Sequence, residues 1–95
     1  MILEVAFLDI TPGREQEYEA AFAKASSIIA SMLGYQSHDL KRCIEKQNRY
    51  LLLVQWETLE DHTEGFRQSE AYQAWKALLH PFYNPFPVVE HYEDL

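Results

Sequence analysis

The sequence has few of the residues on which several classes of function depend. It contains one cysteine, Cys43, and three scattered glycines in 95 residues. A lone cysteine cannot form an internal disulfide, which favours a cytoplasmic protein. No glycine-rich loop is present to bind phosphates or a dinucleotide. No stretch approaches the ~18 apolar residues that a membrane span needs.

Basic residues are also scarce. Eight Lys and Arg stand against 15 Asp and Glu, and the formal net charge is −7. Phosphate backbones and anionic lipid surfaces attract positive charge, so nucleic acids and membranes are poor candidate partners. The sequence has no His-x-x-x-His or Cys-x-x-Cys spacing. We therefore expect neither a metal site nor a bound cofactor.

Apolar residues, by contrast, are plentiful for so short a chain. Hydrophobic residues make up 47% of the sequence and aromatic residues 14%. The length predicts a single domain over residues 1–95, and such a domain buries only roughly 60–65% of the surface of its unfolded chain. The surplus of apolar surface predicts a partner interface, a ligand pocket, or both.

The first third of the chain reads as a strand followed by a helix. Residues 2–10 are almost continuously apolar, which indicates a buried strand. Thr11 is a candidate helix cap, because a threonine oxygen can accept a hydrogen bond from a free amide and Pro12 follows it. Over residues 14–33 the apolar side chains recur at helical spacing, and Gly34 ends the helix. The predicted inner face consists of Tyr18, Phe22, Ala25, Ile29 and Met32.

The middle of the chain predicts a hairpin. Residues 35–44 form a weak strand pattern, and the polar residues 45–48 suit the turn. Residues 49–57 give the clearest strand of the sequence. Its two faces are both apolar, which predicts that both sides of the sheet are covered.

Two short helices and a final strand are expected after the hairpin. Thr58 is a plausible cap for a helix over residues 59–66, and Ser69 for a second helix that runs to about Leu79. Pro81 ends that helix, because proline disfavours helical geometry in the preceding residue. Residues 81–87 form a proline-stiffened aromatic loop, and residues 88–93 form the last strand.

The order of these elements predicts an α+β fold. Strand, helix, strand, strand, helical pair and strand is the split βαβ or ferredoxin-like order, with a four-stranded antiparallel sheet and the helices on one face. The other face is apolar, so we expect a second copy to cover it and form a homodimer through the sheet faces. The alternative is a monomer with an exposed apolar sheet.

Four segments carry a family resemblance. They are the turn Thr11-Pro12-Gly13, Gly34 before the second strand, residues 54–57 (Val-Gln-Trp-Glu) and residues 66–69 (Phe-Arg-Gln-Ser). Together with the element order they make the chain resemble the antibiotic biosynthesis monooxygenase family of dimeric α+β barrel proteins. The resemblance covers essentially the whole chain. It implies a cleft between the helices and the sheet of each subunit that binds a small aromatic molecule.

The family includes several activities. Some members oxidise polycyclic phenols or quinols without metal or flavin, some degrade haem, some are isomerases, and many have no known activity. A histidine that many members carry three residues before the helical serine is Phe66 here. The asparagine, tryptophan and histidine of the haem-degrading members correspond to Ala6, Phe66 and Lys76, so the resemblance disfavours haem degradation.

The four histidines are the candidates for acid–base chemistry. Histidine titrates near neutrality and can take a proton from a phenol or an enol. Strand alternation places Gln36, His38 and Leu40 on one face, which leaves His38 either in the cleft or at the dimer interface. His80 ends a helix, where a pocket role and a favourable interaction with the helix dipole are equally open. For His91 we expect a structural or interface role.

The predicted site combines these histidines with aromatic side chains. His38 or His80 is the expected base and Tyr83 its hydrogen-bond partner, while the stiffened loop could form a lid. An apolar pocket with a few polar groups suits a flat aromatic ligand. The expected pocket residues are Trp56, His62, Phe66, Tyr72 and Trp75.

The sequence therefore leads to one main functional prediction and two alternatives. The main prediction is a cofactor-independent, monooxygenase-like oxidoreductase that acts on a small phenol- or quinol-type substrate. The first alternative, which Phe66 favours, is a non-catalytic small-molecule-binding or stress-related dimer on the same scaffold. The second is a structural dimer without a pocket.

Overall fold

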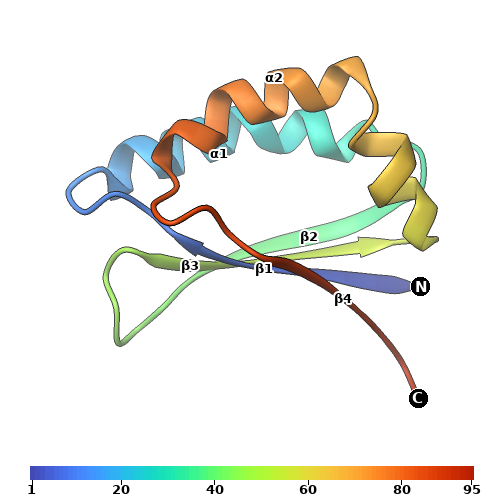
Figure 1. Ribbon diagram of the computed structural model, residues 1–95, viewed down its shortest axis with the longest axis horizontal. Coiled ribbons are helices and arrows are strands. Elements are labelled where there is room, and N and C mark those ends of the chain that lie inside the picture. The colour runs from blue at the N-terminus through green and yellow to red at the C-terminus, as the bar shows by residue number, and fades with distance from the viewer.

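The fold consists of one antiparallel sheet covered on one face by two helices (Figure 1). The computed structural model describes all residues, 1–95. The strands lie in the order β2-β3-β1-β4, and the predicted ferredoxin-like α+β fold is confirmed. The elements are β1 (Ile2–Asp9), α1 (Glu15–Ala30), β2 (Tyr35–Arg42), β3 (Arg49–Trp56), a π-helical segment (Asp61–Phe66), α2 (Glu70–Leu79), a 3-10 turn (His80–Phe82) and β4 (Val89–Glu93).

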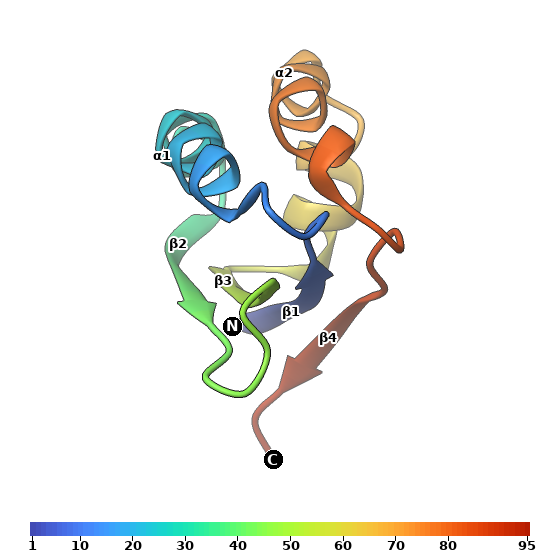
Figure 2. The same cartoon turned by 90° about the vertical axis from the view of Figure 1, so that its left-hand side faces the viewer.

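The two faces of the sheet differ in burial. Viewed end-on, α1 and α2 lie side by side above the sheet, and no element of the chain lies beneath it (Figure 2). Side chains alternate between the faces along each strand. On the helix-facing side of β3, every second residue from Tyr50 to Trp56 is buried. On the outer side, Leu51 and Leu53 are half-buried and Phe7 of β1 is 53% exposed.

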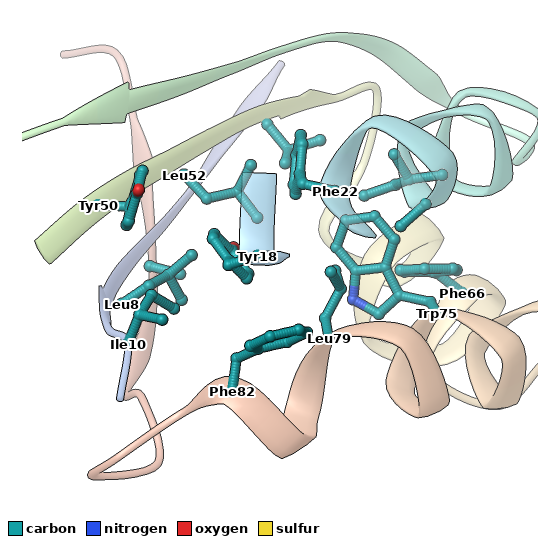
Figure 3. Close-up of a cluster of buried hydrophobic side chains, with 14 of the residues drawn as sticks. Leu8, Ile10, Tyr18, Phe22, Tyr50, Leu52, Phe66, Trp75, Leu79 and Phe82 are labelled. Carbon is teal, nitrogen blue, oxygen red and sulfur yellow. The ribbon is translucent and has the colours of Figure 1, made fainter. Parts of the chain in front are cut away.

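Helix α1 packs an aromatic core against the sheet. Its buried residues are Tyr18, Phe22, Ala25 and Ile29, which confirms the helical spacing seen in the sequence. The predicted fifth member, Met32, lies beyond the end of the helix and is half-buried. Figure 3 shows Tyr18 and Phe22 among the side chains that fill the space between the layers.

Two predicted helix caps are present. The Thr58 hydroxyl accepts a hydrogen bond from the amide of Asp61, and the Asp61 carboxylate accepts one from the amide of Thr58, each at 3.2 Å. The Ser69 hydroxyl accepts a hydrogen bond from the amide of Tyr72 at 3.1 Å. Each cap satisfies an amide that has no partner within its helix.

Position 34, between α1 and β2, requires a glycine for two reasons. Its φ of +84° lies in the left-handed region that favours glycine. A Cβ at this position would also overlap the Asp61 carboxylate. The turn after α1 and the start of the π-helical segment therefore pack directly on each other.

Two local predictions were wrong. Thr11 does not cap α1: its hydroxyl donates to the Phe82 carbonyl at 3.2 Å, and the helix begins at Glu15 without a side-chain cap. The alternation that placed Tyr35 on the opposite face of β2 from His38 also fails, because a bulge between Tyr35 and Ser37 shifts the register. Tyr35 consequently lies on the same side as His38, where its hydroxyl is 2.6 Å from His38 Nδ1.

Helix α2 is followed by a single 3-10 turn rather than by an immediate break. His80 has helical backbone angles, φ −61° and ψ −32°, although Pro81 follows it. The chain then reaches β4 through residues 83–88. No helix of the structure is long and apolar enough to cross a membrane.

Candidate functional site

A cavity of about 190 Å³ lies between the sheet, α2 and the chain that leads into β4. Its floor is the helix-facing side of the sheet, and its walls come from the end of the π-helical segment, from α2 and from the residues after it. The cavity is therefore built from segments that are distant in the sequence. The aliphatic residues of its floor are Ala6, Leu8, Leu52 and Val89.

His80 and Tyr83 bring polar atoms into this cavity. The imidazole of His80 is half-buried, with ring centroids 5.6 Å from Tyr83 and 4.9 Å from Phe86. Burial, and then the positive charge of Lys76, lower the pKa of His80, so its imidazole is neutral at neutral pH. Burial raises the pKa of Tyr83 to about 12, which keeps its hydroxyl protonated. The pair thus offers one proton acceptor and one hydrogen-bond donor.

Two charged residues complete the lining. Arg67 is exposed and is the one cationic side chain of the cavity wall, and it forms no ion pair within the chain. Glu4 projects from β1 and is 5% exposed. Burial raises the pKa of the Glu4 carboxyl, against the opposing effects of a hydrogen bond from Trp56 and the charge of Arg67. An anion in the cavity would therefore meet a guanidinium with no competing carboxylate bound to it.

No group of three or more His, Cys, Asp or Glu side chains is arranged so that it could hold a metal ion. The titratable groups of the cavity lining are Glu4, Arg67, His80 and the hydroxyls of Tyr72 and Tyr83. The chemistry available to these side chains is proton transfer, hydrogen bonding and electrostatic stabilisation of an anion.

The family assignment follows from sequence comparison. Residues 1–78 match the sequence model of the antibiotic biosynthesis monooxygenase family. The chain belongs to this family. The uncharacterized protein YczJ of Bacillus subtilis (strain 168) is 60% identical over 95 residues, which cover 100% of both chains.

Solved structures of similar proteins have the same fold. An antibiotic biosynthesis monooxygenase candidate from Bordetella bronchiseptica is 36% identical, with a TM-score of 0.94 over 99% of this chain and 96% of that one. SnoaB, a cofactor-independent oxygenase from Streptomyces nogalater, is 18% identical, with a TM-score of 0.82 over 99% of this chain and 92% of that one. At that identity the likeness to SnoaB concerns the fold alone.

In this antibiotic biosynthesis monooxygenase family member, four of the residues singled out from the sequence lie on the cavity wall. These are Tyr72, Trp75, His80 and Tyr83. The other three expected pocket residues do not line it. They are buried together: Trp56 stacks on His62 at 5.4 Å and lies 5.9 Å from Phe66. Phe66 in turn meets Tyr72 and Trp75 edge-on and supports the wall from behind.

His38 lies on the helix-facing side of β2 and does not line the cavity. Its Nδ1 is 2.6 Å from the Tyr35 hydroxyl, and its ring packs edge-on against Phe22 of α1 at 5.8 Å. His80 is therefore the histidine that a molecule in the cavity would meet.

Sequence reasoning missed Glu4 and Arg67. Glu4 interrupts an otherwise apolar strand at a position that alternates with Ala6 and Leu8, which is the signal that could have found it. An acid at a core-facing position is rarely buried without a partner. Arg67 has no such signal, because its place beside the cavity depends on how the π-helical segment ends.

Proposed function

We propose that the protein is a cofactor-independent, monooxygenase-like enzyme that acts on a single-ring phenol or quinol. The observation that carries this proposal is the convergence of a neutral His80, the Tyr83 hydroxyl and the free guanidinium of Arg67 on one cavity, of whose 12 lining residues 8 are hydrophobic. Family membership supports it, and the cofactor-independent oxygenase SnoaB has the same fold.

The size of the cavity supports a small substrate. A volume of about 190 Å³ is below the ~300–1,000 Å³ of pockets for drug-sized ligands. It is slightly larger than an apolar cavity of ~150 Å³ that admits benzene. The edges and faces of Trp75 and Phe86 offer an aromatic ring favourable contacts. One ring with one or two polar substituents fits this space.

In the proposed chemistry the substrate itself supplies the electrons that reduce O2. His80 takes the hydroxyl proton of the phenol, and Arg67 stabilises the phenolate while Tyr83 donates a hydrogen bond to it. The electron-rich anion transfers electrons to O2 in the cavity. Overall, a phenol and O2 give a quinone and water: one oxygen atom enters the ring and the other is reduced to water.

We further propose that two copies pair through the outer face of the sheet. Leu51, Leu53 and the exposed Phe7 form an apolar surface there, and such surfaces commonly mark interaction sites. Sedimentation equilibrium should give the mass of a dimer, and Phe7→Lys should weaken the association. A monomer at all concentrations would contradict the pairing.

The free Cys43 suits a cytoplasmic location for this dimer.

The activity is tested by oxygen uptake on a panel of single-ring phenols and hydroquinones. His80→Gln should lower kcat by about 10²–10⁴-fold, the usual contribution of a general base. His38→Gln is the matched comparison, because it removes another half-buried histidine that lies outside the cavity. Equal turnover in wild type and His80→Gln, with both proteins folded by circular dichroism, would contradict the assignment of the base.

A second function is favoured by Phe66. This residue stands where many family members carry a histidine, and it is 1% exposed between aromatic side chains, so it supplies no acid–base group. The corresponding proposal is a dimer that binds a small aromatic molecule without chemistry. Saturable binding of a phenol in calorimetry, with no oxygen uptake for any member of the panel, would favour this function over the first.

A further inference from the structure

Glu4 is a cavity residue whose carboxyl group is only partly occupied by the protein. Its Oε1 accepts a hydrogen bond from Trp56 Nε1 at 2.9 Å. No group of the chain hydrogen-bonds Oε2, and the residue lines the cavity. Oε2 is therefore the carboxyl oxygen that is available to a bound molecule. A buried carboxyl oxygen without a hydrogen-bond partner lowers the stability of the fold unless a ligand or a water molecule binds it.

On the Oε1 side of this carboxyl, His62 and His91 form a row of contacts. Oε1 of Glu4 lies 3.3 Å from Nε2 of His62, and Nδ1 of His62 lies 2.8 Å from Nε2 of His91. The contacts use the two different nitrogens of the His62 ring, so a proton can enter on one and leave from the other. Trp56 stacks on His62 with an interplanar angle of 19° and fixes its orientation.

The sheet register explains why these groups meet. Glu4 of β1 and His91 of β4 are direct cross-strand partners and lie on the same face. The π-helical segment, yellow in Figure 1, covers the end of the sheet where β1 begins and places His62 between them. His62 is 3% exposed, whereas His91 on the edge strand is half-buried. The row of groups thus runs from the cavity to the solvent at the edge of the sheet.

The charges around this row suit neutral carriers. Burial, and then the charge of Arg67, lower the pKa of His62 to about 3, and both also lower the pKa of His91. Burial raises the pKa of Glu4. Arg67 is the cation near all three groups, and its charge lowers the pKa of each. A neutral imidazole has one protonated and one free nitrogen, which is the state a relay needs.

We propose that Glu4 is a second proton acceptor of the cavity and that His62 and His91 carry its proton to solvent. This inference rests on the proposed function, in which conversion of a phenol to a quinone removes two hydrogens, from the oxygen and from the ring. His80 reaches the cavity from the end of α2, whereas Glu4 reaches it from the sheet. The two hydrogens can therefore be taken by different residues.

The proposed transfer conserves protons and charge on every residue. In the protonated form of Glu4, which burial favours, Oε2 takes the proton of the substrate while the proton on Oε1 passes to Nε2 of His62. His62 releases its Nδ1 proton to Nε2 of His91, and His91 releases its own Nδ1 proton to water. One proton leaves the substrate and one enters solvent. The substrate anion that remains is balanced by Arg67.

The first test needs no ligand. NMR of the labelled protein should show His62 and His91 as neutral tautomers at neutral pH. The Glu4 carboxyl should titrate above the ordinary range of a glutamate, and the tautomer ratio of His62 should change with it. Titration of Glu4 in the ordinary range, without any response in His62, would overturn the relay.

The second test measures how fast 4-nitrophenol loses its proton when it binds to His80→Gln, in which Glu4 is the remaining proton acceptor of the cavity. The amount of proton released at equilibrium depends only on the initial and final states, so the rate is the quantity that reports a relay. Stopped-flow absorbance follows the phenolate of the probe at a pH at which the free probe is mainly the neutral phenol. The matched control His80→Gln/Glu57→Gln should ionise the probe as fast as His80→Gln. His80→Gln/Glu4→Gln keeps the acceptor for Trp56 but should ionise the probe about 10²-fold more slowly, and His80→Gln/His62→Phe should do the same.

The outcomes separate the inference from the function on which it rests. Equally fast ionisation of the probe in His80→Gln and in His80→Gln/Glu4→Gln would overturn the relay and leave the proposed function standing. Failure of the bound probe to ionise in His80→Gln would do the same, because His80 would then be the only proton acceptor of the cavity. Failure of the probe to bind any of the proteins would overturn the proposed function and the relay with it.

Discussion

The two helices cover the same sheet but form different interiors. Under α1 the space is filled: Tyr18 and Ala25 are completely buried, and Phe22 is 6% exposed. Under α2 the space holds the cavity, together with the side chains of His80 and Glu4. One half of the fold therefore contributes mainly packing, whereas the other half contains the proposed site.

The difference follows from the lengths and ends of the helices. Helix α1 has 16 residues and repeats its apolar spacing over its whole length, so its inner face stays closed. Helix α2 has 10 residues and ends at a histidine, after which the chain turns away through Pro81 and Phe82. A short helix over a wide sheet leaves space that side chains do not fill.

The largest loss of stability is expected from a substitution that creates a cavity under α1. Phe22→Ala should lower the free energy of unfolding by about 3–5 kcal/mol, because a buried aromatic ring is lost from a packed site. Tyr72→Ala is the matched change under α2, where the ring is half-buried and already borders empty space. Its cost should be smaller, and phenol binding should weaken. Urea denaturation of both variants measures the difference, and equal losses would contradict it.

Most of the fold could be predicted because its signals are local and repeated. The spacing of apolar residues in α1 and the caps at Thr58 and Ser69 each depend on a few neighbouring residues, and each is present. The start of α1 could not be predicted in this way. The Thr11 hydroxyl has two possible partners, and the one it uses is a carbonyl 71 residues away in the sequence.

The site was only partly predictable for a similar reason. Alternation could indicate that His38 faces one side of the sheet, but not how far along the sheet the cavity lies. The bulge at Tyr35 then gives His38 a local partner. Glu4 carried a signal in its strand position, yet its meaning depends on the contacts with Trp56 and His62, which only the folded chain brings together.

A smaller effect, confined to the α2 half, is expected in acid. The unfolded chain binds a proton on His62 at its ordinary pKa of 6.5, whereas the folded protein does so only at about 3. Between these values the unfolded state holds more protons, so stability falls as the pH falls. At about 1.4 kcal/mol per pKa unit the loss amounts to a few kcal/mol. Urea denaturation between pH 7 and 4 measures it.

Glu4 opposes part of this acid effect. Its raised pKa means that the folded protein keeps a proton that the unfolded chain releases above about pH 4.5, so its contribution is lost as the pH rises. His62→Phe retains a ring to stack on Trp56. Its free energy of unfolding should fall less than that of wild type between pH 7 and 4, and the pH dependence that Glu4 causes should remain. A variant with the same slope as wild type would show that His62 is not the cause.

The smallest effect is expected when a tyrosine is replaced by phenylalanine, once in the packed half and once on the cavity wall. The hydroxyl of Tyr18 is buried without a partner at ordinary hydrogen-bond distance, although burial, together with the nearby Tyr83 hydroxyl, raises its pKa. A buried polar group without a partner costs about 1–3 kcal/mol, so Tyr18→Phe should raise the unfolding free energy by about 1 kcal/mol and leave phenol binding unchanged. Tyr83→Phe alters a ring only 6.0 Å away, but on the cavity wall.

Tyr83→Phe should therefore have the opposite profile. The change in stability should be at most about 1 kcal/mol, the net value of one hydrogen bond. Phenol affinity should fall about tenfold, which corresponds to one hydrogen bond of ~1.4 kcal/mol. Thermal unfolding and calorimetry on both variants give the four values. A loss of stability in Tyr18→Phe would show that its hydroxyl has a partner, with the Tyr83 hydroxyl the nearest candidate, and the boundary between the packed half and the cavity would then be a hydrogen bond.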